Sequence, residues 1–492
     1  MFKKSMIVVS ALSVVFVNCG SQDSSGQSAK PGAPVETKEA NTKYKPAFEG
    51  QTRIKGVKTS TPYAFNVISK DLKYPWGITS LPDGRLLINE KGGTMRIAKT
   101  TGELSAPITG IPQVNPAGQG GLLGLTIDPE FTKNRIVYWA FSEKTNGGNL
   151  TAVAKGTLSA DETKIENAKV IYRATPAFPS NLHYGGRILV DKTGNLIVST
   201  GERSDLESRP QAQQLNSALG KVLRITKDGQ PAPGNPFAGR ADARPELYSY
   251  GHRNVQGLAL NPSTGDLWET EFGPRGGDEL NRIQPGKNYG WPTITYGLEY
   301  SGEKVGSGIQ QKEGLEQPVY YWDPVLSPSG ITFYNGDQIP EWKNNLFICG
   351  LSSQHIARIV IQNNHVVGEE RLLAGEDQRF RDITQGKDGA LYAITDGGKL
   401  YRISKKCFCS LQFTVYCLLF TGLKSRRGLA GRARCSAYAP RLRSGFNVEG
   451  RGLPYSILSM RSVVLRTTNC HNQIPSAVEG GSKNIERSRN VL

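Results

Sequence analysis

The sequence predicts an all-β fold made of six similar units, and three observations lead to that prediction. Glycine is abundant, with 56 of 492 residues, whereas methionine is scarce, with 4. Turns that contain Gly-Asp, Asp-Gly or proline recur at short intervals, as in chains folded into many short strands. One pattern also occurs six times: an apolar strand, a turn with Asp or Asn and usually Gly, and a second apolar strand that ends in a small or acidic residue.

The six copies begin at Pro75, Gly121, Gly185, Gln256, Ser329 and Phe380, roughly 45 to 75 residues apart. A turn separates the two expected strands of each copy. In chain order these turns are LPDG, DPEFTKN, DKTGN, NPSTGD, YNGDQIPEWKN and GKDG. The segments on either side are rich in Ile, Leu, Val and aromatic residues, which favour strands.

A ring of six units accounts for this repetition. Each copy has apolar faces that it cannot bury alone, so neighbouring copies are expected to stack. Repeats of this length, with about four short strands each, are typical of propeller blades. We therefore expect a six-bladed β-propeller over residues 61–405, with the final KLYRI beside Ala64–Ile68 to close the ring. A pair of packed sheets is the alternative, but it does not explain six near-equal repeats.

The N-terminus predicts export. Lys3 and Lys4 precede the apolar run MIVVSALSVVFV, which is followed by Asn18, Cys19 and Gly20. This pattern resembles a bacterial lipoprotein signal over residues 1–19, with Cys19 lipidated, and a plain cleaved signal is the alternative. The expected location is the periplasm or the outer membrane, with a lipid anchor as the sole membrane attachment. Residues 20–60, rich in Ser, Gly, Lys and Pro, are expected to be a flexible tether.

The basic charge is concentrated at the C-terminus. Residues 407–492 hold 13 Lys and Arg against 3 Asp and Glu, and so carry +10 of the formal net charge of +17. Three interpretations of the tail, residues 406–492, stay open: a small nucleic-acid or membrane module, a disordered extension, or out-of-frame translation fused to a complete domain. The charge therefore gives no reason to expect a nucleic-acid partner for the body. Cys349 is the one cysteine of residues 61–405, which excludes a disulfide framework there.

Polar residues of unusual kind stand just before the opening strands of four repeats. Loops at one rim of a propeller converge on its central channel, so these residues are expected to form one site. A neutral imidazole can accept a proton at physiological pH, and several guanidinium groups around one cavity indicate an anionic ligand. A sheet-capping histidine and surface ion pairs are the alternative interpretations. The residues are Gln119, His183, Arg253, Asn254, Arg379 and Arg381.

A second pattern indicates a site for a hard cation. Gly273-Pro274, Asp278-Glu279 and the turn Asn288-Tyr289-Gly290 bring carboxylate and backbone carbonyl oxygens into irregular loops. Oxygen ligands from such loops suit calcium. The spacing is not that of an EF-hand.

Several of these motifs together resemble a known family. GQGGLLGLTIDPEF, HYGGRILVD, YGHRNVQGLAL, EFGPRGGDELNRIQPGKNYGWP and RFRDI occur in the same order in the soluble aldose sugar dehydrogenases that depend on pyrroloquinoline quinone (PQQ). That group is similar to the soluble glucose dehydrogenases, with their glucose/sorbosone dehydrogenase domain. The resemblance covers about Pro62 to Ser404 and excludes both ends of the chain.

The resemblance implies oxidation of aldose sugars at C1 to lactones, by hydride transfer to C5 of the quinone. It makes His183 the general base and places Gln119 near the quinone and the sugar. It implies that Arg253, Asn254, Arg379 and Arg381 bind PQQ, and three arginines suit a tricarboxylate cofactor.

The resemblance also implies two calcium sites. Gly273 and Pro274 match backbone-carbonyl ligands of a calcium that polarises the quinone carbonyl. Glu279, and Tyr289 through its backbone carbonyl, match ligands of a second calcium.

Two departures from the family pattern bear on this assignment. Leu182 stands where the glucose dehydrogenases carry Asp, so we expect His183 to lack an acidic neighbour. Ser352 stands where a cation near the quinone is expected, which predicts weaker cofactor binding.

Two other functions remain as alternatives: a catalytically silent propeller that binds carbohydrate or protein at the cell envelope, and a calcium-dependent hydrolase of the lactonase kind. The lactonase alternative lacks a set of acidic and Asn ligands before the opening strands. The physiological sugar depends on variable loops such as Tyr296–Gln317. The electron acceptor stays unidentified, because residues 61–405 hold no Cys-x-x-Cys-His haem motif.

Overall fold

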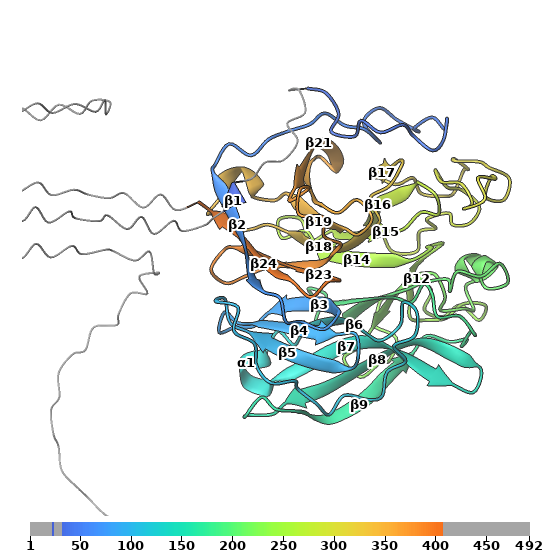
Figure 1. The fold of residues 1–492 in the computed structure, drawn as a ribbon. Helices are drawn as coiled ribbons and strands as arrows, with labels where there is room; N and C mark the ends of the chain where they lie inside the picture. The colour runs from blue at the N-terminus through green and yellow to red at the C-terminus, as the bar shows by residue number, and fades with distance from the viewer. Residues whose placement is uncertain (1–21, 24–31, 407–492) are drawn as a thin grey trace, which may run out of the picture. The chain divides into compact units, whose positions relative to one another are not determined.

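A computed structural model describes residues 22–23 and 32–406 of the chain. Six antiparallel sheets form the body of the protein (Figure 1). The expected signal peptide, the first part of the expected tether and the basic tail from residue 407 lie outside the described residues. None of the described helices has the length and hydropathy needed to cross a membrane.

The sheets follow one another along the chain as six blades. Blade 1 has three strands, and blades 2 to 5 have four strands each. Blade 6 consists of three strands near the end of the body, joined at its outer edge by two N-terminal strands. The strands are, for blade 1, β3 (Pro75–Ser80), β4 (Leu86–Glu90) and β5 (Thr94–Ala98); for blade 2, β6 (Leu122–Ile127), β7 (Ile136–Thr145), β8 (Gly148–Leu158) and β9 (Ile165–Arg173); for blade 3, β10 (Gly185–Val190), β11 (Leu196–Thr200), β12 (Lys221–Ile225) and β13 (Leu247–Tyr250); for blade 4, β14 (Val255–Leu260), β15 (Leu267–Glu271), β16 (Asp278–Ile283) and β17 (Tyr320–Trp322); for blade 5, β18 (Pro328–Phe333), β19 (Leu346–Gly350), β20 (Ile356–Gln362) and β21 (His365–Leu372); and for blade 6, β22 (Phe380–Gln385), β23 (Leu391–Thr395), β24 (Leu400–Lys405), β2 (Tyr63–Ser69) and β1 (Gln22–Asp23).

The predicted ring is confirmed. The opening strands contact one another in a closed cycle, β3, β6, β10, β14, β18, β22 and back to β3. The ends of the ring are joined because β2 pairs with β24, with Phe65 opposite Ile403. All six sequence copies supply the first two strands of a blade, as expected. Short helices, α1 (Phe131–Asn134) and the 3₁₀ segments Arg209–Gln213 and Pro340–Trp342, lie in the connections.

A glycine near the start of most opening strands allows the blades to approach at the centre. A Cβ atom on Gly124 would lie 2.6 Å from the carbonyl oxygen of Gly186, and one on Gly257 would lie 2.6 Å from that of Ser329. At this level the pairing of the first two strands shifts register in every blade. Such bulges re-aim side chains at the rim of a sheet. Gln119, His183, Arg253 and Arg379 stand just before strands that carry such a bulge.

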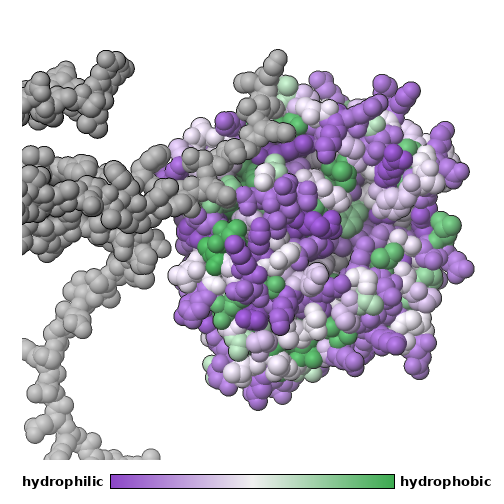
Figure 2. Space-filling model, in the orientation of Figure 1, coloured by the Kyte–Doolittle hydropathy of each residue, from purple (hydrophilic) through white to green (hydrophobic). Residues whose placement is uncertain are grey.

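Apolar clusters fill the spaces between neighbouring blades. Leu87 and Trp139 pack together between blades 1 and 2, and Trp268 and Phe333 pack together between blades 4 and 5. Alternation along each strand sends side chains to both faces of a blade, and both faces are covered by neighbours. The outer face seen in Figure 2 is mostly hydrophilic, with hydrophobic residues scattered over it in small groups.

Residues 32–60 do not form the flexible tether that the composition predicted. This segment runs along the blades that contain β17 and β21 before it enters β2 (Figure 1). The backbone N–H groups of Asn41 and Thr42 donate to the Asp323 carboxylate at 2.8 and 3.1 Å. Gln51 is fully buried and donates to the carbonyl of Pro318 at 2.9 Å. Composition missed this because the contacts are made by backbone and polar groups, which leave no apolar pattern.

Candidate active site

Most of the predicted site residues meet at one rim of the propeller, around a cavity of about 410 Å³. The loops that lead into the opening strands carry Gln119, His183, Arg253 and Arg379 to this cavity, and Arg381 reaches it from β22. The loop after β15 adds Gly273 and Pro274. The structure therefore brings these predicted residues together around one cavity.

The His183 side chain is buried and held by Glu202. Its side chain is 5% exposed, and its Nδ1 atom lies 2.6 Å from Oε1 of Glu202. Burial, with a smaller effect of the Arg253 charge, lowers the pKa of His183 to about 4, although Glu202 opposes the shift. The carboxylate accepts a hydrogen bond from the Nδ1–H group, which leaves a lone pair on Nε2. No residue among those described makes a hydrogen bond to Nε2.

The backbone at His183 is locked by its neighbours. Its φ is 44°, in the left-handed region that non-glycine residues rarely adopt. The His183 N–H donates to Oε1 of Gln119 at 2.8 Å, and its carbonyl accepts from Arg203 at 3.3 Å. Strain of this kind persists only where the surroundings enforce it, and it occurs often at functional sites.

The expectation that His183 lacks an acidic neighbour is wrong. Leu182 is 40% exposed and contributes no acid, but Glu202, just after β11, supplies one from the same blade. The sequence held a signal for it, since several repeats end their second strand at or just before an acidic residue: Glu90, Glu202, Glu271 and Asp396. Only the bend after β11 decides that Glu202 meets the imidazole.

Each arginine of the cavity has a partner. Arg379 and Arg381 both pair with the Asp396 carboxylate, through contacts of 2.8 Å from each Nε. Burial would raise the pKa of Asp396, but the two arginines outweigh burial and hold it below its ordinary value. Arg253 donates to the carbonyl of Gly273 at 2.8 Å and lies 5.2 Å from the ring centre of Trp291.

Asn254 does not line the cavity, contrary to the prediction that grouped it with Arg253. Its side chain is fully buried, and its Oδ1 accepts from the Gly185 N–H at 3.0 Å, which links blades 3 and 4. Its Nδ2 is buried without a hydrogen-bond partner among the described residues. This unpartnered donor directly follows Arg253 in the chain.

The loop that carries Gly273 and Pro274 is organised by Asp278. The Asp278 carboxylate accepts hydrogen bonds from the backbone N–H groups of Gly273, Leu326 and Ser327 at 2.7 to 2.9 Å. Burial raises the pKa of Asp278 to about 6 against the effect of these donors. The Gly273 carbonyl accepts one hydrogen bond from Arg253 and keeps a second lone pair, which a cation could use.

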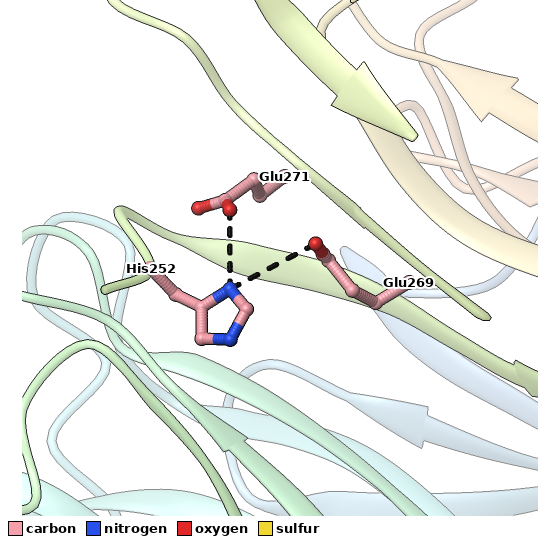
Figure 3. A group of neighbouring side chains, drawn as sticks. All are labelled: His252, Glu269 and Glu271. Atoms are coloured by element: carbon pink, nitrogen blue, oxygen red, sulfur yellow. Dashed lines mark hydrogen bonds and ion pairs between the residues drawn. The ribbon is translucent and has the colours of Figure 1, made fainter. Parts of the chain in front are cut away.

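A small cavity of about 10 Å³ lies beside the main one and holds the other predicted metal ligands. Glu279 and Tyr289 line it together with Glu271. Its volume is close to that of a single water or ion. Next to it, the Nδ1 atom of His252 faces the carboxylates of Glu271 at 3.2 Å and Glu269 at 3.8 Å (Figure 3).

Glu269, Glu271 and Glu279 lie close together without a basic partner. Glu269 and Glu271 are buried and Glu279 is partly exposed, and among the described residues none of them pairs with a lysine or arginine. Burial and the mutual repulsion of the carboxylates raise the pKa values of Glu269 and Glu279 well above the ordinary range. A bound divalent cation would remove this repulsion, so the site fits calcium.

The structure adds lining residues that sequence reasoning missed. Lys91 follows β4, Trp76 lies in β3, and the exposed aromatic side chains of Tyr74 and Tyr300 stand at the cavity. Ser352 also lines it, and accepts a hydrogen bond from the Ser327 hydroxyl at 2.9 Å. Tyr74 directly precedes the opening strand β3, so the register that identified the arginines could also have indicated it. Lys91 follows a second strand and lacks that register.

Comparisons with known proteins agree with this geometry. The family model described as Glucose / Sorbosone dehydrogenase matches residues 72–402. The chain is 40% identical over 345 residues to the aldose sugar dehydrogenase YliI of Escherichia coli (strain K12), covering 69% of this chain and 92% of the relative. A crystal structure of a glucose dehydrogenase is 42% identical, with a TM-score of 0.67, covering 70% of this chain and 99% of that one. The PQQ-bound form of an aldose sugar dehydrogenase from Streptomyces coelicolor is 30% identical, with a TM-score of 0.58 and the same coverage.

Proposed function

The chain belongs to the glucose/sorbosone dehydrogenase family and is a sugar oxidoreductase, and from this premise we propose that it oxidises aldoses at C1 to lactones with PQQ and calcium. The observation that carries the proposal is the neutral His183–Glu202 pair at the wall of an arginine-lined cavity. The PQQ-bound relative supports the choice of cofactor.

The cavity residues fit a planar tricarboxylate. Arg253, Arg379 and Arg381 offer guanidinium groups that pair with carboxylates in a bidentate manner. Asn254 does not line the cavity and is therefore left out of this set. When bound, PQQ supplies the two-electron acceptor for the hydride that leaves C1 of the sugar.

His183 would handle the proton of the same reaction. Oxidation of an aldose at C1 removes a hydride from carbon and a proton from the hydroxyl, so a base must lie at that oxygen. The lone pair on Nε2 of His183 would take this proton, and Glu202 would stabilise the imidazolium that results. Gln119 fixes the His183 backbone and so holds the base in position.

We assign calcium to two places. The carbonyl oxygens of Gly273 and Pro274 would hold one ion at the cavity wall, where it would act as a Lewis acid toward the cofactor. Glu279 and the Tyr289 carbonyl would hold a second ion beside Glu271, where it would neutralise buried carboxylates. His252 and Glu269, which lie beside this second site, were not among the metal ligands predicted from the sequence.

Reconstitution tests the proposal. Apo-protein given PQQ and Ca²⁺ should reduce an artificial electron acceptor when supplied with aldoses, and the His183→Ala variant should bind PQQ without turnover. Absence of turnover for every aldose, with PQQ shown to be bound by absorbance, would favour the silent binding propeller instead.

We also propose that the protein is exported and lipid-anchored in a bacterial envelope, on the evidence of Lys3, Lys4, the apolar run after them and Cys19. Its partners would be the aldose and an electron acceptor yet to be identified, with no nucleic acid. The intact mass of the exported protein tests both ends of the chain. A mature N-terminus at Cys19 with attached lipid is expected, and an unmodified N-terminus elsewhere would contradict the anchor.

A further inference from the structure

The cations of the active-site cavity differ in what neutralises them. Lys91, Arg253, Arg379 and Arg381 line the cavity. Arg379 and Arg381 share the Asp396 carboxylate, and Arg253 is held by the carbonyl groups of Phe272 and Gly273 and by the Trp291 ring. The Lys91 ammonium donates to the Gly118 carbonyl at 2.6 Å, and among the described residues no carboxylate pairs with it.

The fold holds the Lys91 backbone rigidly at the cavity. Its N–H donates to the Tyr74 carbonyl and its own carbonyl accepts the Leu122 N–H, both at 3.0 Å, so it is tied to blades 1 and 2. A Cβ atom on Gly121 would lie 2.6 Å from Cγ of Lys91. The glycine therefore leaves the space that the lysine side chain occupies on its way to the cavity.

The local field favours an anion at this point. The pKa of Lys91 lies below its ordinary value because burial disfavours the charge and because Arg381 repels it, with Asp396 opposing in part. Lys91 and Arg381 line the same cavity from neighbouring blades. An anion placed near both would be attracted by two cations that otherwise repel each other.

We propose that Lys91 is a cofactor-binding residue that pairs with a carboxylate of PQQ. The inference rests on the proposed function and adds a cation that neither the repeat register nor the family motifs indicated. It also bears on Ser352, since Lys91 supplies from blade 1 a positive charge that Ser352 does not supply from blade 5.

The test measures cofactor affinity rather than turnover. Apo-protein in Ca²⁺ is titrated with PQQ, and binding is followed by quenching of tryptophan fluorescence, for which Trp76 in the cavity wall is a suitable reporter. Lys91→Met keeps most of the length of the side chain and removes the charge, and should raise the Kd for PQQ about tenfold, as expected for loss of a charge-assisted hydrogen bond. Lys91→Arg should stay within about threefold of the parent.

Lys99→Met is the matched control, because Lys99 follows the next strand of the same blade and pairs with Glu103 in solvent. It should leave the Kd unchanged. If Lys91→Met binds PQQ as tightly as the parent while its melting temperature is unchanged, the inference is overturned. The inference is also overturned if Lys91→Met leaves the Kd for PQQ unchanged and raises only the KM for negatively charged sugar acids, because Lys91 would then bind the substrate. If the parent itself binds no PQQ, the proposed function fails and the assignment of Lys91 fails with it.

Discussion

Replacing Glu202 by Gln separates the chemistry of the His183 pair from its packing. The carboxylate lies 2.6 Å from the imidazole Nδ1, and the two side chains are 1% and 5% exposed. A charge-assisted hydrogen bond in such surroundings contributes about 1.5–3 kcal/mol. This hydrogen bond would stabilise the imidazolium that forms as His183 takes the sugar proton. Its loss in Glu202→Gln is therefore expected to lower kcat about 10- to 150-fold.

The side-chain volume barely changes in Glu202→Gln, so the cavity and its arginines should remain. The measurement is kcat at saturating aldose and acceptor, with PQQ occupancy fixed by absorbance titration. Glu246→Gln is the control, since this buried carboxylate on the same blade pairs with Arg244 and Tyr172 away from the cavity. A kcat within twofold of the parent at full PQQ occupancy would refute the role assigned to Glu202.

Four further outcomes are expected. Because burial lowers the pKa of His183 to about 4, kcat/KM should stay flat from about pH 7 down to pH 5 and fall only near pH 4, whereas a fall centred near 6.5 would indicate an unshifted histidine. The same residue should make the free energy of unfolding decrease as the pH drops from about 6.5 to 4, since the unfolded chain binds that proton first. Arg187→Met should lower the free energy of unfolding by about 3–5 kcal/mol, because it leaves the Asp382 carboxylate buried and without its ion-pair partner across the ring. The double variant Arg187→Met with Asp382→Leu should recover part of this loss. Equal denaturation midpoints for the parent and the single variant would contradict the prediction. When calcium is present at a hundred times its Kd, its removal should lower the free energy of unfolding by about 2.7 kcal/mol. Glu279→Gln should reduce this loss. A melting temperature that does not change with chelator would exclude the second ion.

The repeat pattern made the fold predictable at the level of blades. Strands, turns and their order follow from local periodicity, and the closing pair of β2 with β24 follows from the need to cover the last sheet. The segment 32–60 was mispredicted because its stability comes from long-range polar contacts to Asp323 and Pro318, which local composition does not record. His183 and three arginines could be assigned to one rim because they occupy similar positions before opening strands, and equivalent positions of the repeats meet at the axis of the ring.

The sequence by itself therefore determined which loops would form the site and which residue types they would bring there. Only the tertiary structure decided their partners. Glu202 is 19 residues from His183, Asp396 serves two arginines at once, and the Asn254 side chain turns to Gly185 rather than to the cavity. These pairings depend on differences of a few ångströms between loops of adjacent strands and blades, and those distances are set by the packing of whole sheets, which no local pattern encodes.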